Sequence, residues 1–407
     1  MRMRKLTRVL LLGAVLAAPR AQAQARLETG GQSPMPAAEW LDQATGHKVV
    51  RLTTLDGTNG SFYFHNNPFV PSAAGAEMVY YHTDAQGQQL RLLNLQTRQS
   101  RPLTGYYKRI QGEIVGRKSH DVYYQVENQV YATNADTRKT RKVYTFPSDF
   151  PGGITSLNAD ETLLAGSLGG AEARDILKKY PAKKDFFDRI FDAKVQHILF
   201  TIDTKKGERR ELYQENTWLG HVQFSPTDPD LLMYCHEGPW HKVDRIWTIS
   251  IKTHQTKLMH KRTVDGEIAG HEFFSPDGQT IWFDLQQPRS VTFYLAGAPL
   301  AGGPEKRYQM QRNEWSIHFN ISPDQSLFAG DGGDPGQVAK APDGQWIYLF
   351  HPEGSQFRAE KLVSMAHHNY PLEPNVHFSP DGKWVIFRAN FEGSEQVYAV
   401  EIARAGA

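Results

Sequence analysis

Short apolar runs separated by polar turns recur along most of this chain. Each unit has an apolar strand start, a turn that often reads Ser-Pro-Asp-Gly, and a second apolar strand. Short runs bounded by Gly, Pro, Asp and Ser are typical of β-strands. Seven such pairs occur, and their first strands begin at Phe69, Ile114, Ile154, Val222, Phe273, Phe319 and Val376.

A third strand often follows each pair, as at residues 197–202 and 396–402. The units repeat every roughly 40–60 residues, which is the range of propeller blades. One small twisted sheet cannot bury both of its faces, whereas a closed ring of sheets can. The pattern therefore predicts an all-β fold, a single seven-bladed β-propeller over residues 26–407. The last unit shows only three strands, and we expect residues 49–53 to supply its fourth strand and close the ring.

Three segments depart from the repeat. Residues 169–193 carry apolar side chains at helical spacing, so we expect a short helical insertion between the third and fourth blades, with one or two helices over a face of the disc. Its lysine pairs form either a solvated helix face or a basic patch that attracts an acidic polymer. Residues 330–343 are rich in Gly, Asp and Pro and predict a loop. Glu39-Trp40-Leu41-Asp42 is expected to form a short helical turn.

The N-terminus has the layout of a secretory signal peptide, which we place at residues 1–25. Basic residues up to Arg8 precede an apolar run from Val9 to Ala18, and Ala21-Gln22-Ala23 supplies small residues for cleavage. The apolar run is too short to span a bilayer, so no membrane anchor is expected. The single cysteine, Cys235, excludes an internal disulfide, which for an exported chain favours a bacterial periplasm over a eukaryotic secretory route. We expect the mature chain to be periplasmic or secreted.

The charges are nearly balanced, with 46 Lys and Arg against 44 Asp and Glu. Nucleic-acid binders normally carry a strong basic excess or a basic stripe. The composition therefore argues against nucleic acid as a partner.

Candidate chemistry concentrates in two runs, Cys235 to Trp247 and Gly270 to Gly278. The first run places His236, Glu237 and Trp240 around a rigid Gly-Pro turn between strands. Functional loops commonly have this composition. For any single residue an ordinary solvated turn is the simpler explanation, but the cluster as a whole favours a site.

The repeats bring further polar residues into register. Four residues before the Ser of each Ser-Pro turn, four consecutive units carry His221, His271, His318 and Asn375. Equivalent positions of propeller blades converge on the axis, so these side chains are expected to be neighbours. Imidazoles and oxygen donors suit a divalent metal, and Glu373 could add a carboxylate. Spacing alone does not separate a metal ligand from a general base, or either from histidines that only bind water.

Several runs across the chain carry a resemblance to a known family. They are Asp42-Gln43-Ala44-Thr45-Gly46, Trp218-Leu219-Gly220-His221, Cys235-His236-Glu237-Gly238-Pro239, Val243-Asp244-Arg245-Ile246-Trp247 and His271-Glu272-Phe273. In these runs the chain resembles the oligogalacturonate lyases, seven-bladed propellers that cleave short pectate fragments.

The resemblance implies a β-elimination, in which a base removes the C5 proton of a uronate and the C4–O bond breaks. By resemblance, His271 matches the base and Arg245 the assisting arginine. A neutral imidazole suits proton abstraction, and a guanidinium stays charged beside a carboxylate. His221, His236, Glu237 and Trp240 are then the candidates for substrate binding.

The resemblance also implies a manganese-type ion that grips the uronate carboxylate. His318 matches one metal ligand of the family. Tyr370, Glu373 and Asn375 stand where a glutamine and a His-x-His pair are expected. Oxygen donors from Glu373 and Asn375 would make a harder site for Mn, with Ca or Mg as alternatives. His367 or His368 could contribute, and loss of the metal is the other alternative.

Two functional hypotheses follow. The first is an exported lyase that cleaves an acidic oligosaccharide, oligogalacturonate, with a divalent metal. The alternative is a non-catalytic periplasmic propeller that binds acidic oligosaccharides or a protein partner. A hydrolase is disfavoured, because the sequence shows neither a placed carboxylate pair nor a Gly-x-Ser-x-Gly elbow.

Overall fold

The computed structural model describes residues 24–32, 37–72 and 76–404. The expected signal peptide lies outside these residues, except for its last two positions. Within the described part of the chain, strands dominate and there are two α-helices and two 3₁₀ turns. The prediction of an all-β fold with few helices is confirmed. None of the described helices is long and apolar enough to cross a membrane.

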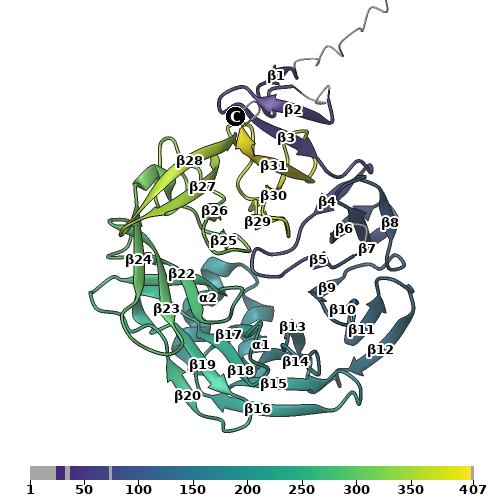
Figure 1. Cartoon of the computed structure of the whole chain (residues 1–407). Coiled ribbons are helices and arrows are strands. Elements are labelled where there is room, and N and C mark those ends of the chain that lie inside the picture. Colours follow the sequence, from purple (N-terminus) through teal and green to yellow (C-terminus); the bar gives the residue numbers. More distant parts are fainter. Residues whose placement is uncertain (1–23, 33–36, 73–75, 405–407) are drawn as a thin grey trace, which may run out of the picture.

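The strands form small sheets that stand around a common axis, like the blades of a propeller (Figure 1). From β6 to β24 every strand pairs antiparallel with the strand before it in the same sheet, so short turns are enough to connect most of them. The first three sheets contain β4 (Thr58–Gly60), β5 (Phe69–Val70), β6 (Glu77–Asp84), β7 (Gly87–Asn94) and β8 (Ser100–Pro102); β9 (Gln111–Val115), β10 (Asp121–Val126), β11 (Gln129–Asn134) and β12 (Thr140–Thr145); and β13 (Gly153–Leu157), β14 (Leu163–Gly169), β15 (His197–Asp203) and β16 (Arg209–Glu215).

The next sheets continue around the ring in the same manner. They contain β17 (Leu219–Phe224), β18 (Leu231–His236), β19 (Ile246–Ser250) and β20 (Thr256–Leu258); β21 (Ile268–Phe274), β22 (Thr280–Gln286), β23 (Phe293–Pro299) and β24 (Lys306–Met310); and β25 (Phe319–Ile321), β26 (Phe328–Gly330), β27 (Trp346–Glu353) and β28 (Gln356–Ser364). One parallel pair, Gln309 with Gln356, links β24 to β28 and joins the last two groups into an eight-stranded sheet. The predicted loop at residues 330–343 contains neither helix nor strand after Gly330.

The two ends of the described chain meet in one sheet. β29 (His377–Phe378), β30 (Trp384–Ala389) and β31 (Gln396–Arg404) are joined by β3 (His47–Arg51), which pairs antiparallel with β31 and sets Val49 opposite Val400. The prediction that an N-terminal strand completes the last unit is confirmed. β2 (Glu39–Asp42) and β1 (Arg26–Leu27) extend the same sheet outward.

The expected helical turn at residues 39–42 is wrong, because this segment is strand β2. Its burial alternates with a period of two, with Trp40 and Asp42 inside. Trp40 pairs with Val49 of β3, and its indole Nε1 donates to Thr29 Oγ1 at 2.8 Å. A four-residue helix would bury only part of that side chain, whereas the ladder buries it completely.

The insertion consists of α1 (Ala171–Lys179) and α2 (Lys183–Ala193), as expected, but its predicted place is wrong. It connects β14 to β15, which pair along their whole length, so it lies within one sheet and not between the third and fourth blades. Antiparallel neighbours have adjacent ends, and the two helices therefore form an enlarged hairpin connection. In the view of Figure 1 they are drawn behind β17 and β18.

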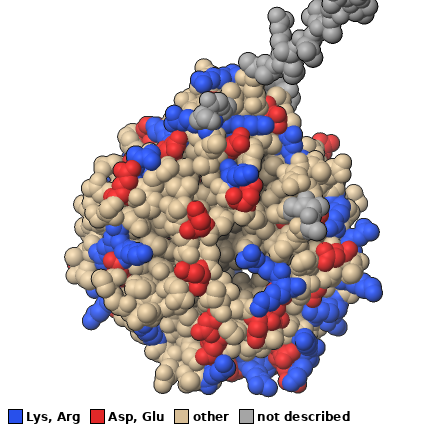
Figure 2. Space-filling model, viewed as in Figure 1, with Lys and Arg blue, Asp and Glu red and all other residues tan. Residues whose placement is uncertain are grey.

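Aromatic side chains fill the spaces between neighbouring sheets. Trp282 meets Phe328 edge to face at 4.9 Å between ring centroids, and Tyr308 stacks on Phe357 at 4.8 Å. Such pairs hold β22 and β24 against β26 and β28. Charged side chains of both signs are interspersed on the face shown in Figure 2, where a hollow opens near the centre.

Candidate functional site

Two histidines of the predicted set lie at bulges in the innermost strands. His221 and His271 have φ values of +47° and +50°. At each of them the ladder to the second strand shifts register, between Gly220 and Gln223 and again between Gly270 and Phe273. A bulge with a left-handed residue turns its side chain away from the regular alternation. Asn375, at the equivalent position, has φ +52°.

His221, His271 and His318 each lie next to a carboxylate in, or directly after, the second strand of the same unit. The pairs are His221 Nε2 with Glu237 Oε1 at 3.0 Å, His271 Nδ1 with Asp284 Oδ1 at 2.7 Å, and His318 Nδ1 with Asp331 Oδ2 at 2.6 Å. The glycine before two of the histidines leaves room for the acid. A Cβ at Gly220 would lie 3.2 Å from Glu237 Cγ, and one at Gly270 would lie 3.2 Å from Asp284 Oδ1.

His271 has the geometry of a general base. A carboxylate only accepts hydrogen bonds, so Asp284 fixes the proton of the neutral ring on Nδ1 and leaves the lone pair on Nε2. The side chain is 29% exposed, so Nε2 is within reach of a substrate. An acid behind the ring also stabilises the imidazolium that forms when Nε2 takes a proton.

His318 lies beside His271, with their ring centroids 5.0 Å apart. It is completely buried, and its Nε2 has no hydrogen-bond partner among the described residues. The nearest acid to that atom is Glu373, whose Oε2 is 3.8 Å away. Because Asp331 holds Nδ1, the lone pair of Nε2 points to a space that Glu373 also reaches. An unpaired buried imidazole nitrogen with a second-layer acid is the pattern of a metal-binding histidine.

The other metal candidates do not complete this set. Asn375 Oδ1 accepts a hydrogen bond from the backbone N–H of Phe64 at 3.0 Å, so the amide holds a loop in place. His367 pairs with Glu28 at 3.0 Å, and His368 Nε2 lies 2.7 Å from the carbonyl of Leu372. The Tyr370 hydroxyl donates to the carbonyl of Asp331. No group of three or more His, Cys, Asp or Glu in the described residues is arranged to hold a metal ion. Among the predicted metal ligands, His318 and Glu373 are thus the two whose side-chain donor atoms approach each other, and their role as ligands stays a prediction.

Arg245 is held between two buried carboxylates. Its NH1 donates to Glu237 Oε2 at 2.8 Å, while Nε and NH2 donate to the two oxygens of Glu272, NH2 at 3.4 Å. Burial alone would raise the pKa of Glu237, but Arg245 and His221 outweigh it and hold that pKa below its ordinary value. Burial would likewise lower the pKa of Arg245, and the two acids raise it instead. Burial would also raise the pKa of Glu272, and Arg245 lowers it instead. Arg245, Glu237 and Glu272 therefore all stay charged.

Two candidates from the Cys235–Trp247 run lie apart from these histidines. His236 stacks on Trp247, with centroids 4.9 Å apart, and its Nε2 lies 3.2 Å from Glu215 Oε2. Trp240 belongs to the 3₁₀ turn η1 (Trp240–Lys242) and packs against Phe187 of α2. Of the three candidates in this run, Glu237 therefore contacts His221, whereas His236 and Trp240 contact other parts of the structure.

The loop after β4 brings residues that the repeat alignment missed. Phe64 packs against His318 with centroids 4.9 Å apart and against His271 at 6.3 Å. His65 follows, and burial together with the charge of His221 lowers its pKa to about 3. It is therefore neutral at ordinary pH. This loop lies outside the Ser-Pro register, so only its two adjacent aromatic rings and histidine could have drawn attention to it.

Comparison with known proteins identifies the family. The sequence profile of the family described as oligogalacturonate lyase matches residues 27–405. The chain belongs to the oligogalacturonate lyase family. Two members of the oligogalacturonate lyase family match over nearly their full length at 26% identity: an oligogalacturonide lyase of Pectobacterium atrosepticum (92% of this chain, 98% of the relative) and an oligogalacturonate lyase of Dickeya dadantii (89% and 95%).

Solved structures of this family share the fold. The crystal structure of an oligogalacturonate lyase from Vibrio parahaemolyticus matches with a TM-score of 0.78 at 23% identity, covering 90% of this chain and 96% of that one. An oligogalacturonate lyase in complex with manganese matches with a TM-score of 0.77 at 24% identity and the same coverage. Membership of the oligogalacturonate lyase family confirms the prediction of an enzyme over that of a non-catalytic binding propeller.

Proposed function

We propose that this protein is an exported lyase that cleaves oligogalacturonides by β-elimination at the cluster of His271, His318 and Arg245. The observation that carries the proposal is His271 itself. Its Nδ1 is held by Asp284, no described residue bonds its Nε2, and it lies beside the unpaired Nε2 of His318. Family membership supports the substrate class.

The reaction needs one proton acceptor and positive charge near the substrate carboxylate. His271 Nε2 takes the C5 proton, and the C5–H electron pair becomes the C4=C5 double bond. The electrons of the C4–O bond leave with the glycosidic oxygen, which then takes up a proton. Asp284 stabilises the imidazolium while it exists. Negative charge builds on the uronate carboxylate during this step, so donors aimed there lower the barrier.

Arg245 has N–H donors left for a hydrogen bond to the substrate carboxylate. A guanidinium has five N–H donors, and the hydrogen bonds to Glu237 and Glu272 use three of them. The two that remain can bind a substrate carboxylate. Glu237 and Glu272 fix the orientation of the planar guanidinium, so Arg245 acts as a preoriented donor rather than as a mobile charge.

His318 and Glu373 would hold a divalent cation. One nitrogen and one carboxylate oxygen suit manganese, which a relative of the same fold binds, and calcium or magnesium are alternatives. When bound, such a cation withdraws electron density from the uronate carboxylate and so acidifies the C5 proton. Asp331 would orient the imidazole of His318 in the same way for any of these three cations.

We also propose that the ring has seven blades, with β21–β24 and β25–β28 counted as two because a single residue pair joins them. Residues 1–25 would direct export and be removed, which places the reaction in the periplasm or outside the cell. Comparing the N-terminus of the mature protein in periplasmic and culture-medium fractions tests this part.

The experiment on function follows ultraviolet absorbance of the unsaturated product from short galacturonate oligomers. We expect turnover with Mn²⁺, loss on chelation, and recovery when Mn²⁺ is added back. His271→Gln is expected to lower kcat by at least about a thousandfold, the loss of a general base. His254→Gln, on an exposed turn, is the control. Saturable binding without any absorbance, with Mn²⁺ or Ca²⁺ present, would reject the lyase and favour a binding protein.

A further inference from the structure

The helical insertion packs on both chain segments that lead to the His221–Glu237 pair. Trp218, three residues before His221, contacts Phe187 of α2 with ring centroids 5.3 Å apart. On the other side, a Cβ at Gly238 would lie 2.3 Å from Phe191 of α2, so the turn after Glu237 meets this helix closely. The insertion therefore has a fixed position next to the site.

An aromatic and basic surface lies where α2 meets η1. The ring centroids of Trp240 and Phe187 are 5.7 Å apart, and Lys183 Nζ lies 5.2 Å from the Trp240 ring and 5.7 Å from the Phe187 ring. Both rings are half-buried and Lys183 is exposed. This surface is thus open to a solute on one side.

This surface is adjacent to the strand that carries the base. η1 packs against β21, which holds His271 and Glu272. Trp240 itself is three residues beyond Glu237, the partner of Arg245. A polymer that occupies the cluster could therefore extend onto η1.

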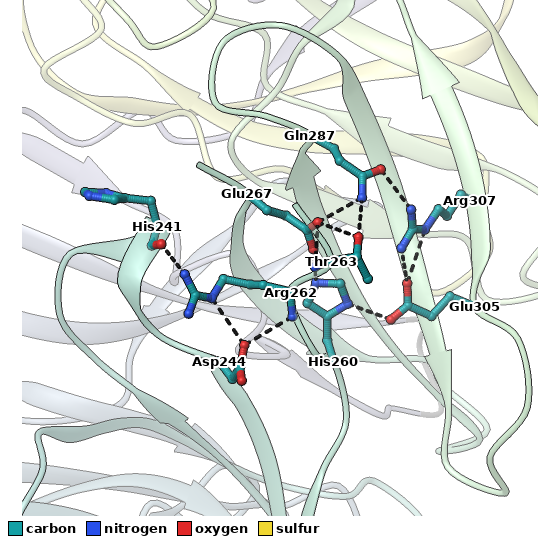
Figure 3. Close-up of polar contacts among 9 residues, drawn as sticks. All are labelled: His241, Asp244, His260, Arg262, Thr263, Glu267, Gln287, Glu305 and Arg307. Carbon is teal, nitrogen blue, oxygen red and sulfur yellow. Dashed lines mark hydrogen bonds and ion pairs between the residues drawn. The ribbon is translucent and has the colours of Figure 1, made fainter. Parts of the chain in front are cut away.

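Hydrogen bonds from Arg262 hold the turn that carries Trp240 in place. Arg262 donates to the carbonyl oxygen of His241 and, through Nε, to Asp244 Oδ1 at 3.2 Å (Figure 3). These contacts fix the two ends of the segment between Trp240 and Arg245. A preoriented aromatic ring loses little freedom when a ligand stacks on it.

The charge of the insertion matches an acidic ligand. Residues 171–194 carry seven Lys and Arg against five Asp and Glu. None of the ion pairs among the described residues involves Lys183. Within the described part of the chain its ammonium therefore has no carboxylate partner, and the charge-related contacts found for it there are those with the two aromatic rings.

We propose that Trp240 and Lys183 form an outer subsite that binds an additional galacturonate unit of the substrate. The apolar face of the sugar ring stacks on the indole of Trp240, and its carboxylate pairs with the ammonium of Lys183. The subsite rests on the proposed function, since it extends the same substrate chain. It gives longer oligomers a contact that a dimer lying in the cluster does not reach.

The test compares KM for di- and tetragalacturonate in the wild type, Lys183→Ala and Trp240→Leu. We expect each substitution to raise the ratio of tetramer to dimer KM by about fivefold, the scale of one exposed ion pair or one stacking contact. Lys178→Ala is the matched control: it removes the same charge from the same insertion but has no aromatic partner among the described contacts. It is expected to leave the ratio unchanged.

Three outcomes would overturn the subsite: an unchanged ratio in both variants, an equal rise for dimer and tetramer, or the same shift in Lys178→Ala as in Lys183→Ala. The last would mean that only the overall charge of the insertion matters. If the wild type turns over no oligogalacturonide, the proposed function fails separately. Calorimetric binding of tetra- against digalacturonate to the same variants then decides the subsite alone.

Discussion

At the residue scale, Arg245 shows how neighbouring acids stabilise a buried positive charge. A single buried guanidinium would be strongly disfavoured, but two acids flank it and one of them also pairs with His221. Glu237 and Glu272 carry two negative charges and Arg245 carries one positive charge. These three groups therefore have a net charge of −1. A substrate carboxylate therefore needs more positive charge than this arginine supplies, and the cation proposed at His318 and Glu373 would supply it.

His260 is a second buried ionic group, away from the reacting centre. Its Nδ1 lies 2.6 Å from Glu305 Oε1 and its Nε2 lies 2.7 Å from Glu267 Oε1 (Figure 3). Burial alone would lower the pKa of His260, but the hydrogen bonds and charges of the two acids outweigh it and raise that pKa above 6.5. With an acceptor at each nitrogen, the ring is held as an imidazolium that ties β24 to the loop before β21.

This arrangement predicts how stability depends on pH. A raised folded-state pKa stabilises fully below the unfolded value near 6.5, and the contribution is lost as pH rises through the folded value. The pKa values of Glu267 and Glu305 are lowered, so their contributions appear above about 4.5 and fade in acid. His260→Gln should therefore cost most between about pH 5 and 6.5, roughly 3–5 kcal/mol, and progressively less at higher pH.

Chemical denaturation of wild type and His260→Gln across this pH range measures the difference. His120→Gln, which removes a half-buried histidine paired with the exposed Asp136, is the control and should unfold like the wild type. A stability difference that is constant from pH 5 to 9 would show that His260 acts by packing alone.

At the element scale, the sequence predicted strands well where the repeat is regular. His221, His271 and His318 could be placed together because each stands at the same distance before a Ser-Pro turn. Their acids could not, since Asp284 lies in the second strand β22 and Asp331 directly follows the second strand β26, where nothing in the local pattern separates them from other polar residues. The bulges are equally hidden, because only backbone pairing reveals the extra residue at His221 and His271.

The wrong predictions for residues 39–42 and for the place of the insertion have one cause. The local sequence pattern does not specify which strands pair. Residues 39–42 are too few to show a period, and only their pairing with β3 defines them as a strand. The insertion was assigned between blades because its helical pattern is local, whereas its place within a sheet depends on β14 pairing with β15. The contact of Asn375 was hidden for a similar reason, since its amide oxygen accepts a hydrogen bond from the backbone N–H of Phe64, which is distant in the sequence. The roles of Glu373 and Asn375 as metal ligands stay predictions.

The contact between α2 and the turn after Glu237 gives a prediction for these elements. Gly238 has φ +147° and no room for a Cβ beside Phe191, so Gly238→Ala should force the helix and the turn apart. We expect a loss of roughly 1–3 kcal/mol in unfolding free energy, the usual cost of overpacking, together with a higher KM. Phe191→Ala should then restore part of both in the double variant.

Thermal unfolding and oligogalacturonate kinetics of the two single variants and the double variant form a mutant cycle. The expected coupling is negative, meaning that the double variant is better than the sum of the single effects. Strict additivity would mean that the backbone conformation of Gly238, and not its contact with Phe191, causes the loss.

At the scale of the whole molecule, the site exists only when the ring is closed. Its residues come from the loop after β4 and from sheets between β17 and β31, so they are distant in sequence and meet near the axis. β3 fastens the first described part of the chain to the last, and His47 adds to this closure through contacts with Glu360 and the carbonyl of Glu401. An open ring would leave unpaired strand edges at both ends and would no longer fix Phe64 against His318.

Val49 is the residue at which this closure can be tested. It lies in the middle of β3, pairs with Trp40 on one side and Val400 on the other, and is fully buried. Val49→Asp would bury an unpaired carboxylate in that seam and should lower the unfolding free energy by roughly 3–5 kcal/mol. Val291→Asp, at a valine that is 60% exposed, makes the same change outside the seam and should be nearly neutral.

The decisive comparison is between activity and stability at a temperature where Val49→Asp remains folded. If closure assembles the site, this variant should lose oligogalacturonate turnover at temperatures below its own unfolding midpoint, because the last sheet opens before the remaining sheets melt. Hydrogen exchange should then show early loss of protection in β3 and β31 while β14 and β15 stay protected. If instead activity and protection of all sheets fall together at one midpoint, the ring unfolds as a single cooperative unit, and β3 contributes stability without a separate role in forming the site.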